Sequence, residues 1–336
     1  MKSKYIIVTV EDLRVYREIS EGLKLCGCRE YENYIFWRQI DLKLAILYGN
    51  CHFEVLEEYL NNNSVFNRRY FIKRYAVTGV RTEYPTEEDL AECDLLITQD
   101  IREENYLNVK SANYFIGKVS DRATVIRVPN LFGCNLYFPQ CKESDTEKIM
   151  RMHSDVIVEN RLATKLKLWH MIGWEDENLE RIIASGEVPI TDAMVEMIEN
   201  QEVYSAEDIW DKFNKEISKL QKRESVCDIS ISDYILNEYK KVKLFYDPHH
   251  PSKELIHEKG RRILSCLGIE IDEETPCKSA LDSTEVFIYG CVKKALGMEF
   301  EEHLIRKNRY WGSFYQRPMD RKDYVEIYMY WNACND

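Results

Sequence analysis

The chain contains short apolar segments that each end abruptly in polar or small residues, and these segments constrain the fold more than any other feature. Three of them, each with the residue that follows it, are Lys43–Tyr48 before Gly49, Asp94–Thr98 before Gln99, and Lys243–Tyr246 before Asp247. Short apolar segments are typical of strands that are covered on both faces, as in a parallel α/β sheet. Phe71–Val77 and Thr124–Val128 are predicted as further strands.

Amphipathic segments between these strands predict helices on both faces of the sheet. After Cys51, an apolar stripe at helical spacing predicts a helix that is stopped by Asn61–Asn63. Thr86 is a predicted N-cap, because acidic residues follow it in what would be the first helical turn. A further helix is predicted to open near Pro251 and to end at Gly268.

The other parts of the chain are predicted as additions to this α/β core. The start of the chain, up to Val10, predicts a buried first strand. The long charged middle is helical in period, so we expect a mainly helical insertion without strands, and the tail from Glu285 is predicted to be helical again. The predicted division is a strand and helix segment at 1–42, a catalytic core at 43–142 and 242–270, a helical insertion or cap at 143–241, and an aromatic-rich helical part at 271–336 that packs on the core.

The composition excludes several classes of protein. Apolar residues make up 45% of the 336 residues, with 13 Gly and 8 Pro, which excludes a disordered or collagen-like chain. The formal charge of −12 argues against a nucleic-acid partner, and no apolar segment approaches the ~18 residues of a membrane span. The 11 cysteines are scattered without a CxxC pair, so we expect reduced thiols in a cytoplasmic protein.

The ends of the predicted strands carry the first candidate catalytic group. Ligands of open parallel sheets bind beyond the carboxyl ends of the strands, where loops and helix N-termini gather. Cys51 follows a Gly49-Asn50 turn at the start of a predicted helix, where the positive end of the helix dipole favours a thiolate. Cys51 is therefore the candidate nucleophile, and nearby backbone N–H groups and the Gln99 carboxamide are candidate donors to a developing oxyanion.

The loop Asp247–His250 carries the second candidate group. An aspartate three residues before a histidine can accept a hydrogen bond from the imidazole and fix its tautomer. His250 is then predicted to take a proton from the Cys51 thiol or from a substrate hydroxyl. The residues predicted to contact the substrate are Asn50, His52, Gly79 and His249.

A metal site is the competing use of the same side chains. The possible ligands are Cys51, Asp247, His249, His250 and His257. Their spacing matches no standard zinc pattern, so no metal is expected. The chain also has neither a P-loop nor a Gly-x-Gly-x-x-Gly motif, which leaves nucleotide hydrolysis and Rossmann-type dinucleotide binding without support.

Taken in order, these motifs resemble the WcbI-type polysaccharide biosynthesis acetyltransferases. The motifs are Gly49-Asn50-Cys51 after a strand, Asp94–Gln99, the proline-bounded aromatic segment Pro129–Pro139, and His250-Pro251 with its helix. The resemblance covers Lys43–Phe138 and Lys243–Gly268. It implies an SGNH-hydrolase-like fold, flavodoxin-like in its parallel sheet with helices on both faces, and an association with coenzyme A.

The wider SGNH superfamily gives these motifs their implied roles. Gly49-Asn50-Cys51 is similar to the block that supplies the nucleophile, and Asp247 with His250 matches the late Asp-x-x-His in spacing. The family usually has Gln after the cysteine, whereas this chain has His52. The superfamily's oxyanion asparagine has no clear counterpart, and Gln99 is the substitute offered here.

The resemblance implies transfer of an acyl group, expected to be acetyl, from coenzyme A to a sugar hydroxyl in polysaccharide biosynthesis. Either Cys51 is acylated and His250 then deprotonates the acceptor, or His250 activates the acceptor directly and Cys51 shapes the site. An SGNH-like esterase or deacetylase would use the same triad with water as the acceptor. A non-catalytic binding protein on this fold is the third alternative, and it would tolerate the loss of both side chains. The acceptor sugar, the residues that bind coenzyme A and the oligomeric state are left open.

Overall fold

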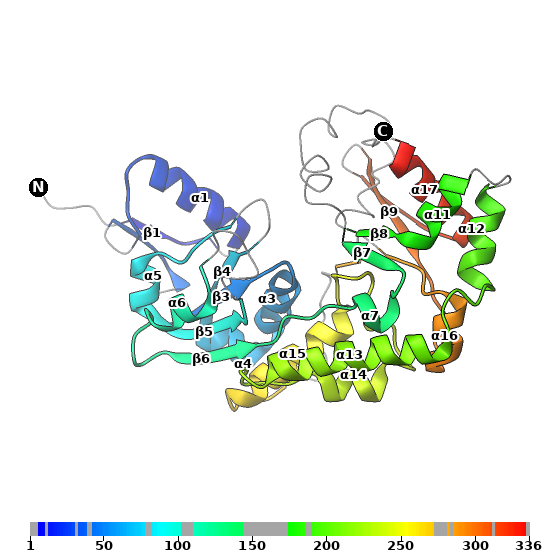
Figure 1. Ribbon diagram of the computed structural model, residues 1–336. Coiled ribbons are helices and arrows are strands. Elements are labelled where there is room, and N and C mark those ends of the chain that lie inside the picture. Colours follow the sequence, from blue (N-terminus) through cyan, green and yellow to red (C-terminus); the bar gives the residue numbers. More distant parts are fainter. Residues whose placement is uncertain are drawn as a thin grey trace, which may run out of the picture. The chain divides into compact units, whose positions relative to one another are not determined.

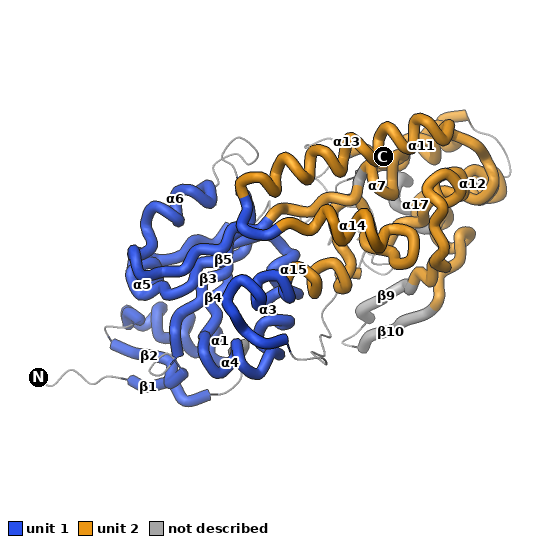
Figure 2. The backbone as a smooth tube through the Cα atoms, turned by 90° about the horizontal axis from the view of Figure 1, so that it is seen from below, with its two compact units in different colours: residues 1–128, 227–229, 260–277 blue, residues 129–226, 230–259, 278–336 orange. Residues whose placement is uncertain are grey.

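The computed structural model describes residues 6–10, 13–30, 33–38, 42–77, 82–101, 110–143, 174–185, 190–271, 281–282, 285–310 and 313–333. The chain divides into two compact units, which Figure 2 shows in different colours. The first unit comprises Met1–Val128, Cys227–Ile229 and Gly260–Cys277, and the second comprises Pro129–Val226, Ser230–Lys259 and Lys278–Asp336. Each unit has a buried apolar cluster of its own. Residues 242–270 contribute to both units.

The first unit is built around a parallel sheet of four strands in the order β4-β3-β5-β6 (Figure 1). The strands are β3 (Lys43–Gly49), β4 (Tyr70–Ala76), β5 (Cys93–Gln99) and β6 (Thr124–Val128). β3 pairs in parallel with both β4 and β5, and β5 pairs in parallel with β6. The predicted α/β fold with a parallel sheet is therefore confirmed, and four of the six predicted strands form that sheet.

Helices flank this sheet. They are α1 (Leu13–Leu25), α3 (His52–Asn62), α4 (Ser64–Arg69), α5 (Glu87–Glu92) and α6 (Ala112–Ile116). On one face, Tyr16 of α1, Leu90 of α5 and Phe115 of α6 pack in one cluster with Ile46 and Tyr48 of β3. On burial these apolar side chains supply most of the stability of such a layer, at roughly 25 cal/mol for each Å² removed from water.

Local capping explains where several of the predicted helices begin and end. Thr86 accepts from the backbone N–H of Asp89 at the start of α5, as its position before the acidic turn predicted. Helix α15 (Lys253–Cys266) is followed by Gly268, whose φ of +62° is the left-handed conformation that glycine adopts at least cost. Within the first unit, a Cβ at Gly260 of α15 would lie 2.3 Å from the Tyr59 ring, so this helix and α3 pack closely.

The first strand is shorter and more exposed than predicted. β1 (Ile6–Val8) pairs in parallel with β2 (Tyr34–Phe36) and does not join the four-stranded sheet. Ile6 and Ile7 are 40% and 51% exposed, whereas Val8 is buried. The prediction of a buried first strand is wrong for Ile6 and Ile7, because a strand with a single partner strand buries fewer of its side chains than one inside a sheet.

The second unit is mainly helical. Its helices are α7 (Cys134–Tyr137), α11 (Glu177–Ser185), α12 (Ile190–Glu199), α13 (Ala206–Glu224), α14 (Ser232–Glu238), α16 (Gly290–Leu296) and α17 (Arg321–Ala333). Ser205 caps α13 by accepting from the backbone N–H of Asp208.

Two strand pairs in this unit were not predicted. β7 (Cys141–Glu143) pairs antiparallel with β8 (Trp174–Asp176), so the expectation of a middle segment without strands is wrong. β9 (Ile305–Tyr310) and β10 (Ser313–Pro318) form an antiparallel hairpin in the tail that was predicted to be helical. These strands alternate poorly in polarity, so the period that marks a half-buried strand is missing from the sequence.

The segment Lys243–Tyr246, which was predicted as a strand, forms a loop instead. It has an isolated antiparallel bridge from Phe245 to Pro251. The Tyr246 N–H donates to the His250 carbonyl at 2.9 Å, so the chain folds back on itself within a few residues. Its apolar side chains enter the helical cluster of the second unit rather than a sheet. The burial of Leu244 and Phe245 was predicted correctly, but the prediction that this segment pairs as a strand was wrong.

Helix α16 also begins later than predicted. The N–H of Val286 donates to the Tyr246 carbonyl at 2.8 Å, and the N–H of Ile288 donates to the Glu302 carboxylate at 3.1 Å. The N-cap residue Tyr289 has an extended backbone, with φ of −61° and ψ of 143°. The helix therefore starts at Gly290 and not at Glu285.

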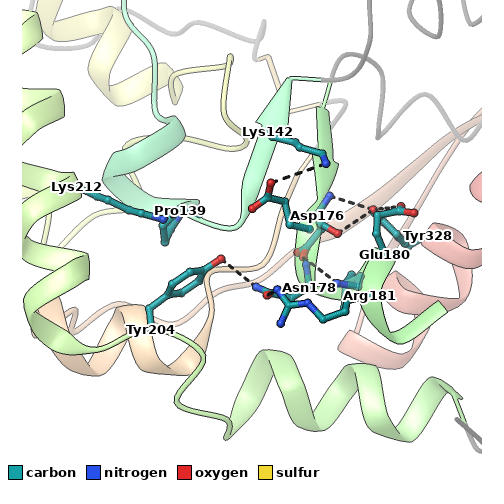
Figure 3. Close-up of polar contacts among 11 residues, drawn as sticks. Pro139, Lys142, Asp176, Asn178, Glu180, Arg181, Tyr204, Lys212 and Tyr328 are labelled. Carbon is teal, nitrogen blue, oxygen red and sulfur yellow. Dashed lines mark hydrogen bonds and ion pairs between the residues drawn. The ribbon is translucent and has the colours of Figure 1, made fainter. Parts of the chain in front are cut away.

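Asp176 is a buried carboxylate that links three helices of the second unit (Figure 3). Its Oδ1 accepts from the backbone N–H groups of Asn178 and Leu179 at 3.0 and 3.1 Å and so caps α11. The hydroxyl of Tyr289, at the start of α16, lies 3.0 Å from both carboxylate oxygens. The hydroxyl of Tyr328 in α17 accepts from the Asp176 N–H at 3.0 Å. Removal of this side chain would leave several buried donors without an acceptor.

We expect the unfolding free energy of the protein to depend on the titration of Asp176. Burial raises the pKa of this carboxyl to about 7, although bonds from Leu179, Tyr289 and Asn178 oppose the shift. Between about pH 4 and pH 7 the folded carboxyl holds a proton that an unfolded aspartate has lost, so stability falls as the pH rises through this window. At 1.36 kcal/mol per pKa unit, the Asp176→Asn variant should lack a decline of roughly 4 kcal/mol that the wild type shows. Urea unfolding of both proteins across this range measures the difference.

The exposed neighbour Glu177 provides the control for this prediction. Glu177→Gln removes a carboxylate one position away without touching the buried cluster, so its pH dependence should match that of the wild type. A wild type and an Asp176→Asn variant with parallel stability profiles would contradict the prediction.

Candidate active site

The thiol of Cys51 lies on the turn between β3 and α3. β3 ends at Gly49, α3 begins at His52, and Cys51 is the N-cap residue with a helical φ of −55° and ψ of −24°. Its side chain makes no capping hydrogen bond and is half-buried. The side chain of Asn50 supplies the cap instead, because its Oδ1 accepts from the His52 N–H at 3.1 Å. The sulfur therefore takes no part in holding the turn.

Gln99, at the end of the neighbouring strand β5, binds the same turn. Its Oε1 accepts from the Asn50 N–H at 2.7 Å, and its Nε2 donates to the Asn50 Oδ1 at 2.9 Å. Nε2 also lies 3.5 Å from the His52 Nδ1. Gln99 and His52 are 0% and 1% exposed. A buried carboxamide with these partners fixes the backbone on which Cys51 sits, because leaving any of its polar atoms unbonded would be costly.

Gly49 is required by how closely its neighbours approach. A Cβ at this position would lie 2.8 Å from the Phe53 ring and 2.9 Å from the Gln99 Oε1. Both of these side chains are fully buried and cannot move aside freely. The sequence suggested the glycine as a turn former, but no pattern in the sequence identified Phe53 as the side chain that packs against it.

Gly49→Ala should therefore damage the turn. We expect a loss of about 1–3 kcal/mol in unfolding free energy, the range for overpacking a filled site, together with slower alkylation of Cys51. Gly22→Ala is the matched control, since a Cβ there meets nothing within 4 Å. In the interior of helix α1 it should be neutral or slightly stabilising. Denaturant titration and iodoacetamide labelling measure the two effects, and equal stabilities of the two variants would contradict the argument.

The second unit contains the Asp247–His250 loop. The Asp247 Oδ2 lies 2.6 Å from the His250 Nδ1, and its Oδ1 accepts from the N–H groups of His249 and His250 at 2.7 and 2.9 Å. Asp247 is 1% exposed, while the His250 side chain is 26% exposed. The predicted carboxylate–imidazole pair is thus present in the structure. It orients the ring so that Nδ1 carries the proton and Nε2 is left as the acceptor.

The proline-bounded segment 129–139 supports this loop within the same unit. The Gly133 N–H donates to the Pro248 carbonyl at 2.9 Å. A Cβ at Gly133 would lie 2.5 Å from the Phe245 ring, so the glycine allows the two segments to meet. The rings of Phe132 and His249 are 6.3 Å apart in an edge-to-face arrangement. The sequence placed this aromatic segment among the motifs but did not indicate that it contacts the histidines.

The structure thus brings the predicted site residues together in two groups. Asn50, His52 and Gln99 surround the Cys51 turn in the first unit, and Asp247, His249 and His250 form the loop in the second. Gly79 lies outside the described residues. Within the ranges that the structure covers, no group of three His, Cys, Asp or Glu side chains is arranged to hold a metal ion. No described helix is long and apolar enough to cross a membrane.

The parallel sheet of four strands and the helices that flank it define the fold class as α/β. The chain belongs to the family described as "Polysaccharide biosynthesis enzyme WcbI", which matches residues 44–154 and 174–272. The resemblance noted from the motifs is confirmed by this match. A search of curated proteins finds no match.

A solved structure of WcbI has the same fold. It is 18% identical to this chain and has a TM-score of 0.55, and the alignment covers 87% of this chain and 90% of the other. That structure is described as WcbI, "a novel polysaccharide biosynthesis enzyme", in a native form without a disulfide bond between coenzyme A and one of its cysteines. At 18% identity, the likeness between the two structures shows a shared fold and nothing further.

Proposed function

We propose that this protein transfers an acyl group, expected to be acetyl, from coenzyme A to a sugar hydroxyl in polysaccharide biosynthesis. Family membership supports an enzyme of polysaccharide biosynthesis. The related structure is described in terms of coenzyme A and one of its cysteines, which supports coenzyme A as the acyl donor here. The family description supports a saccharide as the proposed acceptor. The cytoplasm is the proposed compartment because coenzyme A and reduced thiols are both found there.

The observation that carries the proposal is the construction of the Cys51 turn. The thiol takes no part in capping α3, and the side chains of Asn50 and Gln99 hold the turn without it. A structural cysteine would instead be packed as an apolar side chain. A free thiol at the N-terminus of an 11-residue helix is suited to nucleophilic attack.

The Asp247–His250 pair supplies the proposed base. The imidazole needs a partner that fixes its tautomer and stabilises its charged form, and the Asp247 carboxylate at 2.6 Å is such a partner. The partial exposure of His250 leaves its ring accessible. We propose that this ring and the Cys51 thiol act on one substrate.

In the proposed reaction, His250 takes the proton of the Cys51 thiol and the thiolate attacks the thioester carbonyl. The carbon–sulfur bond to coenzyme A breaks, and the departing thiolate takes the proton from His250. His250 then removes a proton from the sugar hydroxyl, which attacks the acyl-cysteine, and that proton returns to the Cys51 sulfur. The products are an acylated sugar and coenzyme A, and the protein is unchanged. In the alternative sequence, His250 activates the sugar for direct attack on the thioester.

The contacts of Gln99 favour a positioning role over the predicted oxyanion role. Its carboxamide is engaged with Asn50 and lies beside His52, so it acts through the turn that carries Cys51. Asn50, His52, Gly79 and His249 remain proposed substrate contacts.

Incubation with acetyl-CoA tests the proposal. We expect thermal stabilisation by acetyl-CoA, and a mass increase of one acetyl group that is lost when a saccharide acceptor is added. An acetyl adduct absent from Cys51→Ala, but present in a control variant of the exposed Cys26, would place the acyl group on the proposed nucleophile. Hydrolysis of p-nitrophenyl acetate without any response to coenzyme A would instead identify an esterase that uses the same residues. No response to either compound would favour a binding protein.

A further inference from the structure

The first unit contains a cavity of about 190 Å³ between α1 and β4. Arg17, Glu21 and Lys24 of α1 line one side, and residues 71–75 of β4 line the other. β4 is an edge strand of the four-stranded sheet, so the cavity runs along the sheet edge. Helix α1 lies before the residues that match the family, so this wall belongs to a part of the chain that the family match does not cover.

We infer that this cavity binds one sugar unit of a neutral saccharide, as a site additional to the Cys51 turn. The inference uses the family's link to polysaccharides for its ligand class, and it does not depend on acyl transfer.

Two residues of the lining, Lys73 and Glu30, form an ion pair. The Lys73 Nζ lies 2.6 Å from a Glu30 oxygen and 2.8 Å from an Asp89 oxygen, and the lysine side chain is 11% exposed. The hydroxyls of Tyr16 and Tyr75 donate to Glu30 and Asp89 respectively. Asp89 is 3% exposed, and the charge of Lys73 holds the pKa of its carboxyl below the usual value against the effect of burial. The ammonium is thus matched by acids within the protein and does not call for an anionic ligand.

Two further residues of the lining, Arg17 and Arg74, form ion pairs with Glu57 of α3. Arg17 of α1 and Arg74 of β4 each bond to one Glu57 carboxylate at 2.8 Å. These contacts tie α1 to the sheet edge and leave further guanidinium N–H groups of both arginines as donors. Glu21 adds carboxylate acceptors on the same wall, and Lys24 adds an ammonium donor.

This mixture of donors and acceptors selects the ligand. A phosphate or carboxylate would meet the carboxylates of Glu21, Glu30 and Glu83 in the lining, and a cation would meet Arg17 and Lys24. A hydroxyl group accepts from a guanidinium and donates to a carboxylate at once, so a polyol can satisfy both kinds of partner without a net charge. Each bond of this type to a charged group is stronger than one between neutral groups.

The size of the cavity fits the same ligand. The volume is below the ~300 Å³ at which drug-sized pockets begin, so the cavity holds a single ring rather than a nucleotide or coenzyme A. Phe71 and Tyr16 are only 3% and 4% exposed, so the polar side chains of the lining make the contacts with the ligand.

Binding of methyl glycosides to the whole protein tests the inference. The probes are the neutral methyl glycosides of glucose, galactose and N-acetylglucosamine, with glucuronate and glucosamine as charged comparisons, and the measurement is ligand-observed NMR with calorimetry. We expect at least one neutral glycoside to bind with a dissociation constant in the millimolar range. Glu21→Ala and Lys24→Ala should each weaken that binding about tenfold, as expected for one lost bond to a charged group. Both side chains are exposed, so neither variant should unfold the protein.

Two comparisons separate this site from the proposed active site. Glu18→Ala alters an exposed residue of the same helix that does not line the cavity, and it should bind as the wild type does. Cys51→Ala should also bind as the wild type does, whether or not acyl transfer occurs. The inference is overturned if no neutral glycoside binds, if a charged probe binds more tightly than every neutral one, or if the Glu21 and Lys24 variants bind as the wild type does.

Discussion

Replacing Cys51 with alanine should abolish acyl transfer and leave the fold intact. Loss of a nucleophile that forms a covalent intermediate lowers kcat by several orders of magnitude, so we expect a decrease on the order of 10⁴-fold or more. The fold should survive because the thiol makes no capping bond and the turn is held by Asn50 and Gln99. Steady-state kinetics with acetyl-CoA measures the loss, and thermal unfolding measures the stability.

A matched cysteine variant controls for nonspecific effects. Cys26→Ala removes an exposed thiol of the same unit and should retain full activity. A Cys51→Ala variant that keeps at least a tenth of the wild-type kcat would contradict the acyl-cysteine intermediate. That result would support direct attack of the sugar on the thioester.

Asp247→Asn should lower kcat almost as strongly while leaving the loop in place. The new amide can still accept from the N–H groups of His249 and His250 through its oxygen, as Asp247 does at 2.7 and 2.9 Å. Its NH₂ group would face the His250 Nδ1 and favour the tautomer that has its proton on the wrong nitrogen. Comparable changes in Ser-His-Asp triads reduce kcat by about 10⁴-fold, and we expect a loss of similar order here.

The neighbouring histidine provides the comparison for this variant. His249 meets Asp247 through its backbone N–H, so His249→Ala should retain that bond. As a proposed substrate contact, His249 should affect KM more than kcat. Equal losses of kcat in the two variants, or an active Asp247→Asn enzyme, would contradict the role given to the carboxylate–imidazole pair.

The sheet could be predicted because its strands carry their own signal. β3 and β5 are nearly continuous apolar segments, and segments of this kind are typical of strands that are buried on both faces in a parallel sheet. The apolar stripe also predicted helix α3, and Thr86 with the acidic residues that follow it predicted the start of α5. These are local properties, and the tertiary structure agrees with them.

The errors arise where a segment is buried but its backbone hydrogen bonds are not those of a strand in a sheet. In the segment Lys243–Tyr246, Leu244 and Phe245 are buried as predicted, but the backbone bonds within its own loop and to Val286 rather than to a strand. Apolar residues indicate that a segment is covered and do not indicate by what. The β9–β10 hairpin was missed because its residues lack the alternation that marks a strand.

The local contacts of the predicted site residues follow only partly from the sequence. The positions of Cys51 and Gln99 at the ends of adjacent strands follow from the sheet order, and the Asp247–His250 bond follows from their spacing in the chain. The direction of the Gln99 carboxamide toward Asn50 could not be read from the sequence, because it depends on the register between β3 and β5. The contact between Gly49 and Phe53 depends instead on the turn from β3 into α3.

The reciprocal amide bonds between Asn50 and Gln99 make these two positions thermodynamically interdependent. Each side chain satisfies polar atoms of the other, so a change at one of them leaves its buried counterpart with a donor or acceptor that has lost its match. In a double-mutant cycle, the combined loss should be smaller than the sum of the single losses. Among relatives of this chain, we therefore expect the residues at these two positions to covary. The positions are far apart in the sequence, and they covary because they are neighbours at the ends of adjacent strands.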